Sequence, residues 1–194
     1  MKLEILQAGE PVLRQLARPL RAEEIHSPEL EQTIANMLET LRLAPGVGLA
    51  APQIGLDIQL AIIEDREQYH ASWTGPQLQA RQRVPVPFHV LINPQLESDG
   101  DATAEFYEGC LSVPGYAAEV PRHRLVRVRY LDQHGEPQQV SAEGWYARIL
   151  QHEIDHLSGT LYIDRMKTRT FMTLQNYTSR WRDREDEARR IFAG

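Results

Sequence analysis

The sequence lacks the features that define several common classes of protein. It has one cysteine, Cys110, in 194 residues, so no disulfide can form within the chain, and a lone thiol in a reducing compartment is more often reactive than structural. Its net charge of -6 does not provide the basic field that DNA binding requires. The apolar stretch Leu60–Ile63 is too short to cross a membrane, and Met1–Glu4 does not open a signal peptide. These absences predict a soluble, cytoplasmic protein without membrane or direct DNA partners.

The residues that are present predict one globular domain over residues 1–194. Hydrophobic residues make up 42% of the chain and charged residues 25%, as is usual for a domain that buries its own core. Ser27 and Pro28 are typical of a helix start, and apolar residues then recur at helical spacing, which predicts a helix from Pro28 to about Leu43. The polar stretch Glu64–Pro87, with three prolines, predicts a long surface flap.

Further patterns predict strands in the middle of the chain and helices at its end. The expected strands are Ile58–Ile63, Phe88–Ile92 (closed by Asn93-Pro94), Leu125–Leu131 and Gln138–Ala142. The expected helices are Gly144–Leu157 and Thr168–Phe192. Since strands and helices do not alternate, we expect an α+β fold. In this fold antiparallel strands surround the helix at 144–157, with one further helix near each end of the chain.

The segment His152–His156, His-Glu-Ile-Asp-His, lies within that central helix. Residues four apart share a helix face, so His152 and His156 can reach one metal ion. Glu153 is displaced around the helix by one residue and can hold a water beside the metal rather than the metal itself. The pattern therefore predicts a metal-binding helix that also carries an acid/base group.

The third ligand is not decided by the spacing. A catalytic site normally has three protein ligands and one open position. The metalloprotease type whose third histidine continues the helix pattern is disfavoured, because Tyr162 stands at that position. Asp164 is one candidate and Cys110 is another. Gly109 would permit an unusual backbone angle beside Cys110, although a buried structural cysteine is an equally good interpretation.

A third segment, Gly46–Gly55, combines a glycine-rich turn with small residues and one amide side chain, Gln53. A phosphate loop is disfavoured because no Gly-Lys-Ser/Thr follows. Close approach of a substrate backbone is the better use of such a turn, with Gln53 as its polar side-chain donor.

Taken in this order, the three segments resemble the peptide deformylase family. That family carries Gly-x-Gly-x-Ala-Ala-x-Gln, then Glu-Gly-Cys-x-Ser, then His-Glu-x-x-His, and this chain has all three. The resemblance extends from about Gly9 to Phe171. The 64–87 insertion, Gly115-Tyr116 and Gly144–Arg148 resemble the subgroup that includes organellar enzymes, although we expect no organellar presequence here.

The resemblance implies hydrolysis of the formyl group from N-formylmethionyl peptides and nascent chains, with release of formate. Cys110, His152 and His156 would bind one divalent metal ion. The resemblance implies Fe²⁺ in the cell, and a thiolate with two imidazoles also suits Zn²⁺, Ni²⁺ or Co²⁺.

The same resemblance and simple chemistry give roles to the neighbouring residues. Glu153 would accept a proton from water and pass it to the leaving amine. Gln53 and the backbone N–H of Leu111 would stabilise the oxyanion. Glu108 would orient a ligand histidine, with a surface ion pair to a residue such as Arg122 as the alternative.

Substrate contacts are expected from five residues. An apolar pocket for the methionine side chain would have Val47, Ile149 and Leu150 as walls. Gly48 and Gly109 would let the extended peptide approach the chain, in the manner of an added strand.

Two other functions fit part of the pattern. A zinc metallopeptidase or aminopeptidase could use the same helix, and it predicts that Cys110 is dispensable. A domain with a purely structural metal predicts a closed four-ligand site, in which Glu153 has no function.

The C-terminal segment Thr168–Gly194 is rich in arginine and acidic residues. A solvated helix with paired charges explains this composition. The family resemblance adds a weak, salt-sensitive association with the ribosome through residues 168–194.

Overall fold

Helix α2 (Pro28–Arg42) forms where the sequence predicts a helix. In this computed structural model, which describes residues 1–192, the side chain of Ser27 accepts a hydrogen bond from the Leu30 backbone N–H at 3.2 Å. One face of the helix, including Met37 and Leu41, is buried. A capped start and an apolar stripe are together sufficient to specify such a helix.

The main sheet has five antiparallel strands in the order β1-β2-β3-β6-β7. Their bounds are β1 (Gly48–Ala50), β2 (Leu60–Asp65), β3 (Val86–Ser98), β6 (Leu125–Leu131) and β7 (Pro137–Glu143). Successive side chains of β2 point to opposite faces: Leu60 and Ile62 join the apolar cluster around α2, while Ala61 and Ile63 join a second cluster. The strand is therefore buried on both sides, which explains its continuous apolar run.

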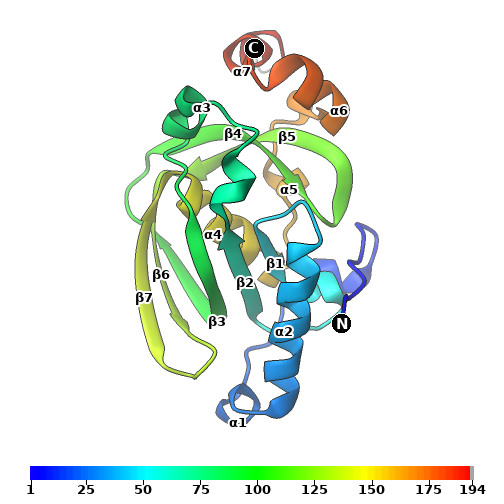
Figure 1. The fold of residues 1–194 in the computed structure, drawn as a ribbon, viewed down its shortest axis with the longest axis vertical. Helices are drawn as coiled ribbons and strands as arrows, with labels where there is room; N and C mark the ends of the chain where they lie inside the picture. The colour runs from blue at the N-terminus through cyan, green and yellow to red at the C-terminus, as the bar shows by residue number, and fades with distance from the viewer. Residues whose placement is uncertain (193–194) are drawn as a thin grey trace.

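Helix α4 (Gly144–Leu157) has the predicted bounds and supplies that second cluster with Ala147, Ile149 and Leu150. It follows β7 directly and contacts strands of the main sheet as well as β5. Figure 1 shows α4 among the strands at the centre of the molecule, with α2 on the outside. This central position holds the His152–His156 segment rigidly.

A second, three-stranded sheet was not predicted. It consists of the hairpin β4 (Thr103–Cys110) and β5 (Val113–His123), together with the short strand β8 (Met172–Thr173). The hairpin passes over α4 in Figure 1. Because Cys110 ends β4, the hairpin carries the cysteine to the histidine helix.

Three expectations about secondary structure are wrong in detail. Strand β3 does not close at Asn93-Pro94, since Asn93 adopts a φ of 50° at an irregularity in the pairing and the strand continues to Ser98. The insertion at 64–87 is partly helical and is fixed by Arg83, which donates to Asp65 at 2.8 and 2.9 Å. The single helix expected at Thr168–Phe192 is divided into several short elements.

The short elements complete the chain. They are η1 (Pro11–Arg14), α1 (Ala22–Ile25), η2 (Ala51–Ile54), η3 (Glu67–His70), α3 (Gly75–Ala80), α5 (Tyr162–Arg165), η4 (Thr168–Thr170), α6 (Leu174–Asn176), the π-helical turn η5 (Tyr177–Trp181) and α7 (Glu185–Phe192). Within residues 1–192, every helix is too short or too polar to cross a membrane.

Candidate active site

The structure brings together Cys110, His152 and His156, although the first histidine comes 42 positions after the cysteine in the sequence. One possible ligand atom from each lies within 4.8 Å of the other two. Cys110 Sγ is 3.3 Å from His156 Nε2, and the two imidazole rings are 5.1 Å apart between centroids. The one-turn spacing on α4 brings the histidines together, and the end of β4 adds the thiol.

This donor set fits a divalent metal ion. A thiolate and two imidazoles suit zinc and the later first-row transition metals, and no fourth His, Cys or carboxylate joins the cluster among the described residues. A three-ligand site of this kind leaves a coordination position for a reactant. Asp164, the other candidate ligand, is engaged elsewhere: it pairs with Arg14 and accepts from the Leu161 N–H at 2.7 Å.

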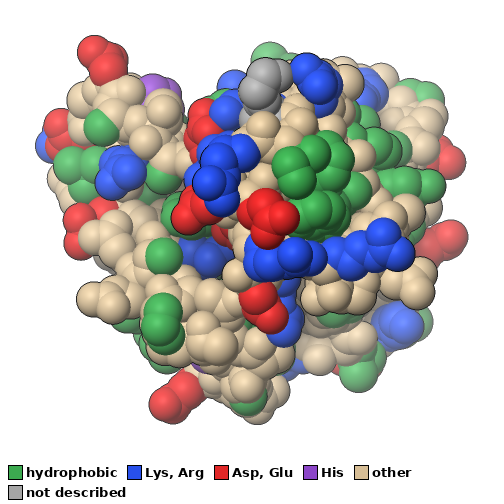
Figure 2. Space-filling model, turned by 90° about the horizontal axis from the view of Figure 1, so that it is seen from above, with side chains coloured by type: hydrophobic (Ala, Val, Ile, Leu, Met, Phe, Trp, Pro, Cys, Tyr) green, Lys and Arg blue, Asp and Glu red, His purple; other side chains and the backbone are tan. Residues whose placement is uncertain are grey.

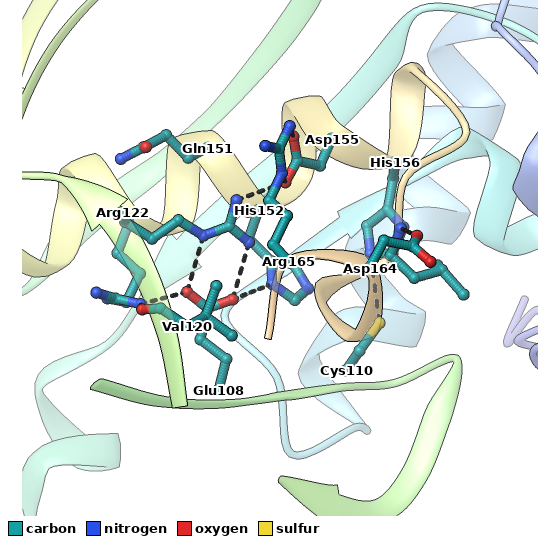
Figure 3. Close-up of polar contacts among 12 residues, drawn as sticks. Glu108, Cys110, Val120, Arg122, Gln151, His152, Asp155, His156, Asp164 and Arg165 are labelled. Atoms are coloured by element: carbon teal, nitrogen blue, oxygen red, sulfur yellow. Dashed lines mark hydrogen bonds and ion pairs between the residues drawn. The ribbon is translucent and has the colours of Figure 1, made fainter. Parts of the chain in front are cut away.

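Glu108 lies behind His152 and is 6% exposed. It is two residues before Cys110, so the strand alternation of β4 brings both side chains to one face. Its Oε2 is 3.0 Å from His152 Nδ1, which leaves His152 Nε2 for the ligand cluster. Figure 3 shows Glu108 between His152 and Arg122, with Cys110 pointing toward His156. A carboxylate in this position fixes the tautomer and the orientation of a ligand imidazole.

Two buried arginines, Arg122 and Arg148, neutralise Glu108. Arg122 donates to both of its oxygens at 3.0 and 2.9 Å, and Arg148 donates to Oε1 at 2.5 Å. Burial would raise the pKa of Glu108, but Arg122, His152 and Arg148 outweigh that effect and hold the pKa well below its usual range. Glu108 therefore does form the ion pair with Arg122 that the alternative interpretation expected. This pair lies in the interior of the protein and not on its surface.

The sequence gave no reason to select Arg122 or Arg148. They lie 14 and 40 residues from Glu108 along the chain, so no local spacing connects them. Arg122 also pairs with Asp155, the residue before His156, and Arg165 donates to Asp155 at 2.7 and 2.8 Å. The network ties both ends of the His152–His156 segment to the second sheet.

Glu153 lies beside the ligand cluster and is 4% exposed. Burial raises its pKa to about 7, since it outweighs the opposing effect of His152. Its Oε2 is buried without a hydrogen-bond partner from the protein, so it can bind a reactant or water. A carboxyl group with a pKa near neutrality suits proton transfer in both directions.

Gln53 reaches the cluster from η2. Its Oε1 accepts from the Ala50 backbone N–H at 2.9 Å, which fixes the amide, and its Nε2 donates to Ser112 Oγ at 3.1 Å and lies 3.6 Å from Cys110 Sγ. Ser112, the serine of the Glu-Gly-Cys-x-Ser motif, had no role assigned from the sequence and donates its backbone N–H toward Cys110 Sγ at 3.4 Å.

A cavity of about 740 Å³ opens above these groups. Gly48, Gly109 and Leu111, three residues selected from the sequence, line it. Gly109 is not among the glycines with positive φ, so the unusual backbone angle expected beside Cys110 is not found. A Cβ there would meet the Tyr116 carbonyl oxygen at 3.3 Å. The glycine therefore suits the close approach of β4 to β5 at this point.

The apolar part of the cavity differs from the prediction at one residue. Val47 and Ile149 line it as expected, but Leu150 is 0% exposed and packs into the core, so it is not a pocket wall. Leu150 is about 100° further around the helix than Ile149, and in this direction it meets the core instead of the cavity. Five aromatic residues that were not predicted also line the cavity, namely Tyr69, Trp73, Tyr107, Trp145 and Tyr177.

Together these groups can hold a divalent metal ion at the floor of a cavity, with a buried proton acceptor and an amide donor beside it. The model of the polypeptide deformylase family matches residues 2–171. The chain is 47% identical over 173 residues to "Peptide deformylase 1A, chloroplastic" of Solanum lycopersicum, covering 89% of this chain and 62% of that protein. It is 46% identical over 179 residues to "Peptide deformylase 1" of Streptomyces coelicolor, covering 92% and 80%.

A solved structure agrees with the sequence comparison. The Met-Ala-Ser-bound class I type b peptide deformylase from Acinetobacter baumannii has a TM-score of 0.76 at 32% identity, with 86% of this chain and 99% of that chain covered. The chain belongs to the polypeptide deformylase family. The resemblance to this family and to organellar members is thereby confirmed, and the chain spans less than two thirds of the Solanum relative.

Proposed function

We propose that this protein is a metal-dependent peptide deformylase, which removes the N-terminal formyl group from formylmethionine of nascent polypeptides and releases formate. The observation that carries the proposal is the cluster of Cys110, His152 and His156, with the buried carboxyl group of Glu153 beside it, at the floor of the cavity. The Met-Ala-Ser bound to the Acinetobacter relative supports it, because a peptide that begins with methionine is the product of such a reaction.

Cys110, His152 and His156 are the proposed ligands, and Glu108 orients His152. A divalent ion held there supplies Lewis acidity and makes water a nucleophile near neutral pH. Ferrous iron is the proposed ion in the cell, while Zn²⁺, Ni²⁺ and Co²⁺ suit the same ligands. Metal analysis of protein purified without oxygen tests this assignment.

The remaining steps belong to the side chains. Glu153 takes a proton from the attacking water and delivers it to the amine that leaves, a role for which a pKa of about 7 is suitable. The Nε2 of Gln53 and the backbone N–H of Leu111 donate to the oxyanion that forms on the formyl group. The Nε2 of Gln53 already donates to Ser112 Oγ, so it must either donate to both acceptors or give up this bond when the oxyanion forms.

The substrate enters as an extended chain. Its backbone lies beside Gly48 and Gly109, which line the cavity, and the methionine side chain contacts Val47 and Ile149. Main-chain hydrogen bonds recognise a peptide independently of its sequence, which suits an enzyme acting on many nascent chains.

The cytoplasmic location stays a prediction.

Incubation with formyl-Met-Ala-Ser tests the function. We expect one formate per peptide and no cleavage of peptide bonds, whereas a metallopeptidase would cleave unformylated peptides and would not need Cys110. In Glu153→Gln, the amide cannot carry a proton, so metal content should be retained while kcat falls by about 10²–10⁴. A variant that keeps more than about a tenth of the wild-type kcat would remove Glu153 from this role.

A further inference from the structure

The C-terminal segment beyond the family match takes part in the cavity. The match ends at residue 171, and β8 begins immediately afterwards by pairing Met172 with Ala117 and Thr173 with Tyr116 of β5. Residues 113–117 of β5 line the cavity. The pairing therefore attaches the segment to a wall of the proposed substrate site.

Two side chains of this segment, Leu174 and Tyr177, also line the cavity. Tyr177 is 6% exposed and stacks on Tyr107, with ring centroids 4.7 Å apart and an interplanar angle of 25°. Leu174 is 44% exposed, so it lies at the rim, where a ligand could cover it. Tyr177 begins the π-helical turn η5, a rare conformation that is frequent at functional sites.

The 64–87 insertion contributes Tyr69 and Trp73 to the same cavity. Figure 1 shows α3 of this insertion at the same end of the molecule as α6 and α7, and Gln77 Nε2 donates to Asp183 Oδ1 at 2.8 Å between the two segments. Figure 2 looks onto this end and shows hydrophobic side chains gathered among charged ones near the C-terminus.

Glu185 connects the two segments more firmly. Its Oε1 accepts a hydrogen bond from Tyr177 Oη at 2.5 Å and pairs with Arg81 of the insertion. The guanidinium of Arg81, which is 3% exposed, lies 4.7 Å from the Trp73 ring centroid. The Glu185 carboxylate therefore contacts both segments of the cavity wall. It binds Tyr177 of the C-terminal segment directly, and it binds Arg81, which packs on Trp73 of the insertion.

We propose that Leu174, Tyr177, Tyr69 and Trp73 form an apolar subsite for a large apolar or aromatic side chain that follows formylmethionine in the substrate. The inference rests on the proposed deformylase function. The formyl group must lie at the Cys110–His152–His156 cluster, and an extended chain advances about 3.3 Å per residue, so the next residues reach the rim. Aromatic walls bind a large apolar side chain through buried area and ring contacts.

The test compares formyl-Met-Ala-Ser with formyl-Met-Phe-Ser and formyl-Met-Ala-Phe. In the wild type, at least one phenylalanine peptide should have a lower KM than formyl-Met-Ala-Ser. Leu174→Ala should raise that KM about fivefold, because contact area is lost, and should raise the KM for formyl-Met-Ala-Ser by a smaller factor. Leu16→Ala, at a leucine that is 73% exposed and lies outside the cavity, should leave kcat and KM unchanged for both peptides.

Glu185→Gln tests positioning, since it weakens the hold on Tyr177 and Arg81. It should raise KM for the phenylalanine peptide and leave kcat unchanged, whereas general damage to the fold would lower kcat for all three peptides. The subsite is refuted when the wild type does not favour phenylalanine or when Leu174→Ala affects all peptides equally. Calorimetric binding of Met-Phe-Ser and Met-Ala-Phe, which needs no formate release, tests the subsite separately if the deformylase function itself fails.

Discussion

Gly48 and Glu153 are packed so closely that no side chain fits between them. A Cβ on Gly48 would lie 2.3 Å from Oε1 and 2.4 Å from Cδ of Glu153. Gly48 is hydrogen-bonded into the sheet through β1, and Glu153 is fixed on α4. The backbone of one element therefore determines where the carboxyl group of the other can lie.

We expect Gly48→Ala to reduce kcat by about 10²-fold, because a displacement of about 1 Å at a reacting group can have that effect. The added methyl must push the Glu153 carboxyl group aside, while the metal ligands keep their places. Formate release measures the loss of activity, and metal content of the same sample shows whether the ligands still bind the ion. Gly75→Ala is the matched control, since a Cβ at Gly75 meets nothing within 4 Å; equal activity of the two variants would contradict the prediction.

Gln53→Leu should affect both catalysis and stability. Loss of the Nε2 donor should lower kcat by about 10²–10³ with little change in KM. Loss of Oε1 leaves the buried Ala50 N–H without its acceptor, which should cost about 1–3 kcal/mol of unfolding free energy. Gln53→Glu keeps an acceptor for Ala50 and removes the donor, so it should lose activity with a smaller loss of stability in urea unfolding. An effect confined to KM would make Gln53 a residue that binds the ground state.

Glu108→Ala should destabilise the fold by about 3–5 kcal/mol, since it leaves Arg122 and Arg148 buried without their shared carboxylate. It should also weaken metal binding about 10–100-fold, because His152 loses its partner. Urea unfolding and metal competition measure the two effects. Glu97→Ala, at an exposed ion pair with Arg129, should change stability by less than about 1 kcal/mol. Comparable losses in both variants would show that burial of the Glu108 cluster is unimportant.

The parts of the structure that sequence predicts well are those set by local physics. A cap followed by a helical stripe specifies α2, and the four-residue spacing of His152 and His156 specifies one ligand face on α4. Strand β6 has the predicted bounds because its side chains alternate. In each case the signal lies within one turn or within neighbouring residues.

The parts that were missed depend on contacts between distant segments. Strand β5 contains Pro114, Gly115 and Pro121, which normally argue against a strand, and it is stabilised by pairing with β4. The helix expected at Thr168–Phe192 is interrupted near its start, where Met172 and Thr173 pair with β5. The buried partners of Glu108 and the aromatic cavity walls also come from distant segments, so residue spacing could not predict them.

Ribosome association through residues 168–194 can be tested without disturbing the cavity. Truncation after Asn176 would remove Tyr177, which stacks on Tyr107, so charge reversal is the cleaner change. Arg180 and Arg190 are both exposed, and neither lines the cavity. The double variant Arg180→Glu, Arg190→Glu should weaken co-sedimentation with ribosomes at low salt, because fewer cations face phosphate, and should leave formate release from free peptides within about twofold of the wild type.

The matched control reverses Arg21 and Arg127, whose side chains are 70% and 45% exposed outside this segment. Both double variants lower the net charge equally, so a general electrostatic attraction would weaken in both to the same extent. Docking through the segment predicts a loss only in the Arg180, Arg190 variant, and that loss should disappear as salt screens the wild-type interaction. If the wild type does not co-sediment, or if both variants lose binding equally, residues 168–194 serve only the fold and the cavity wall.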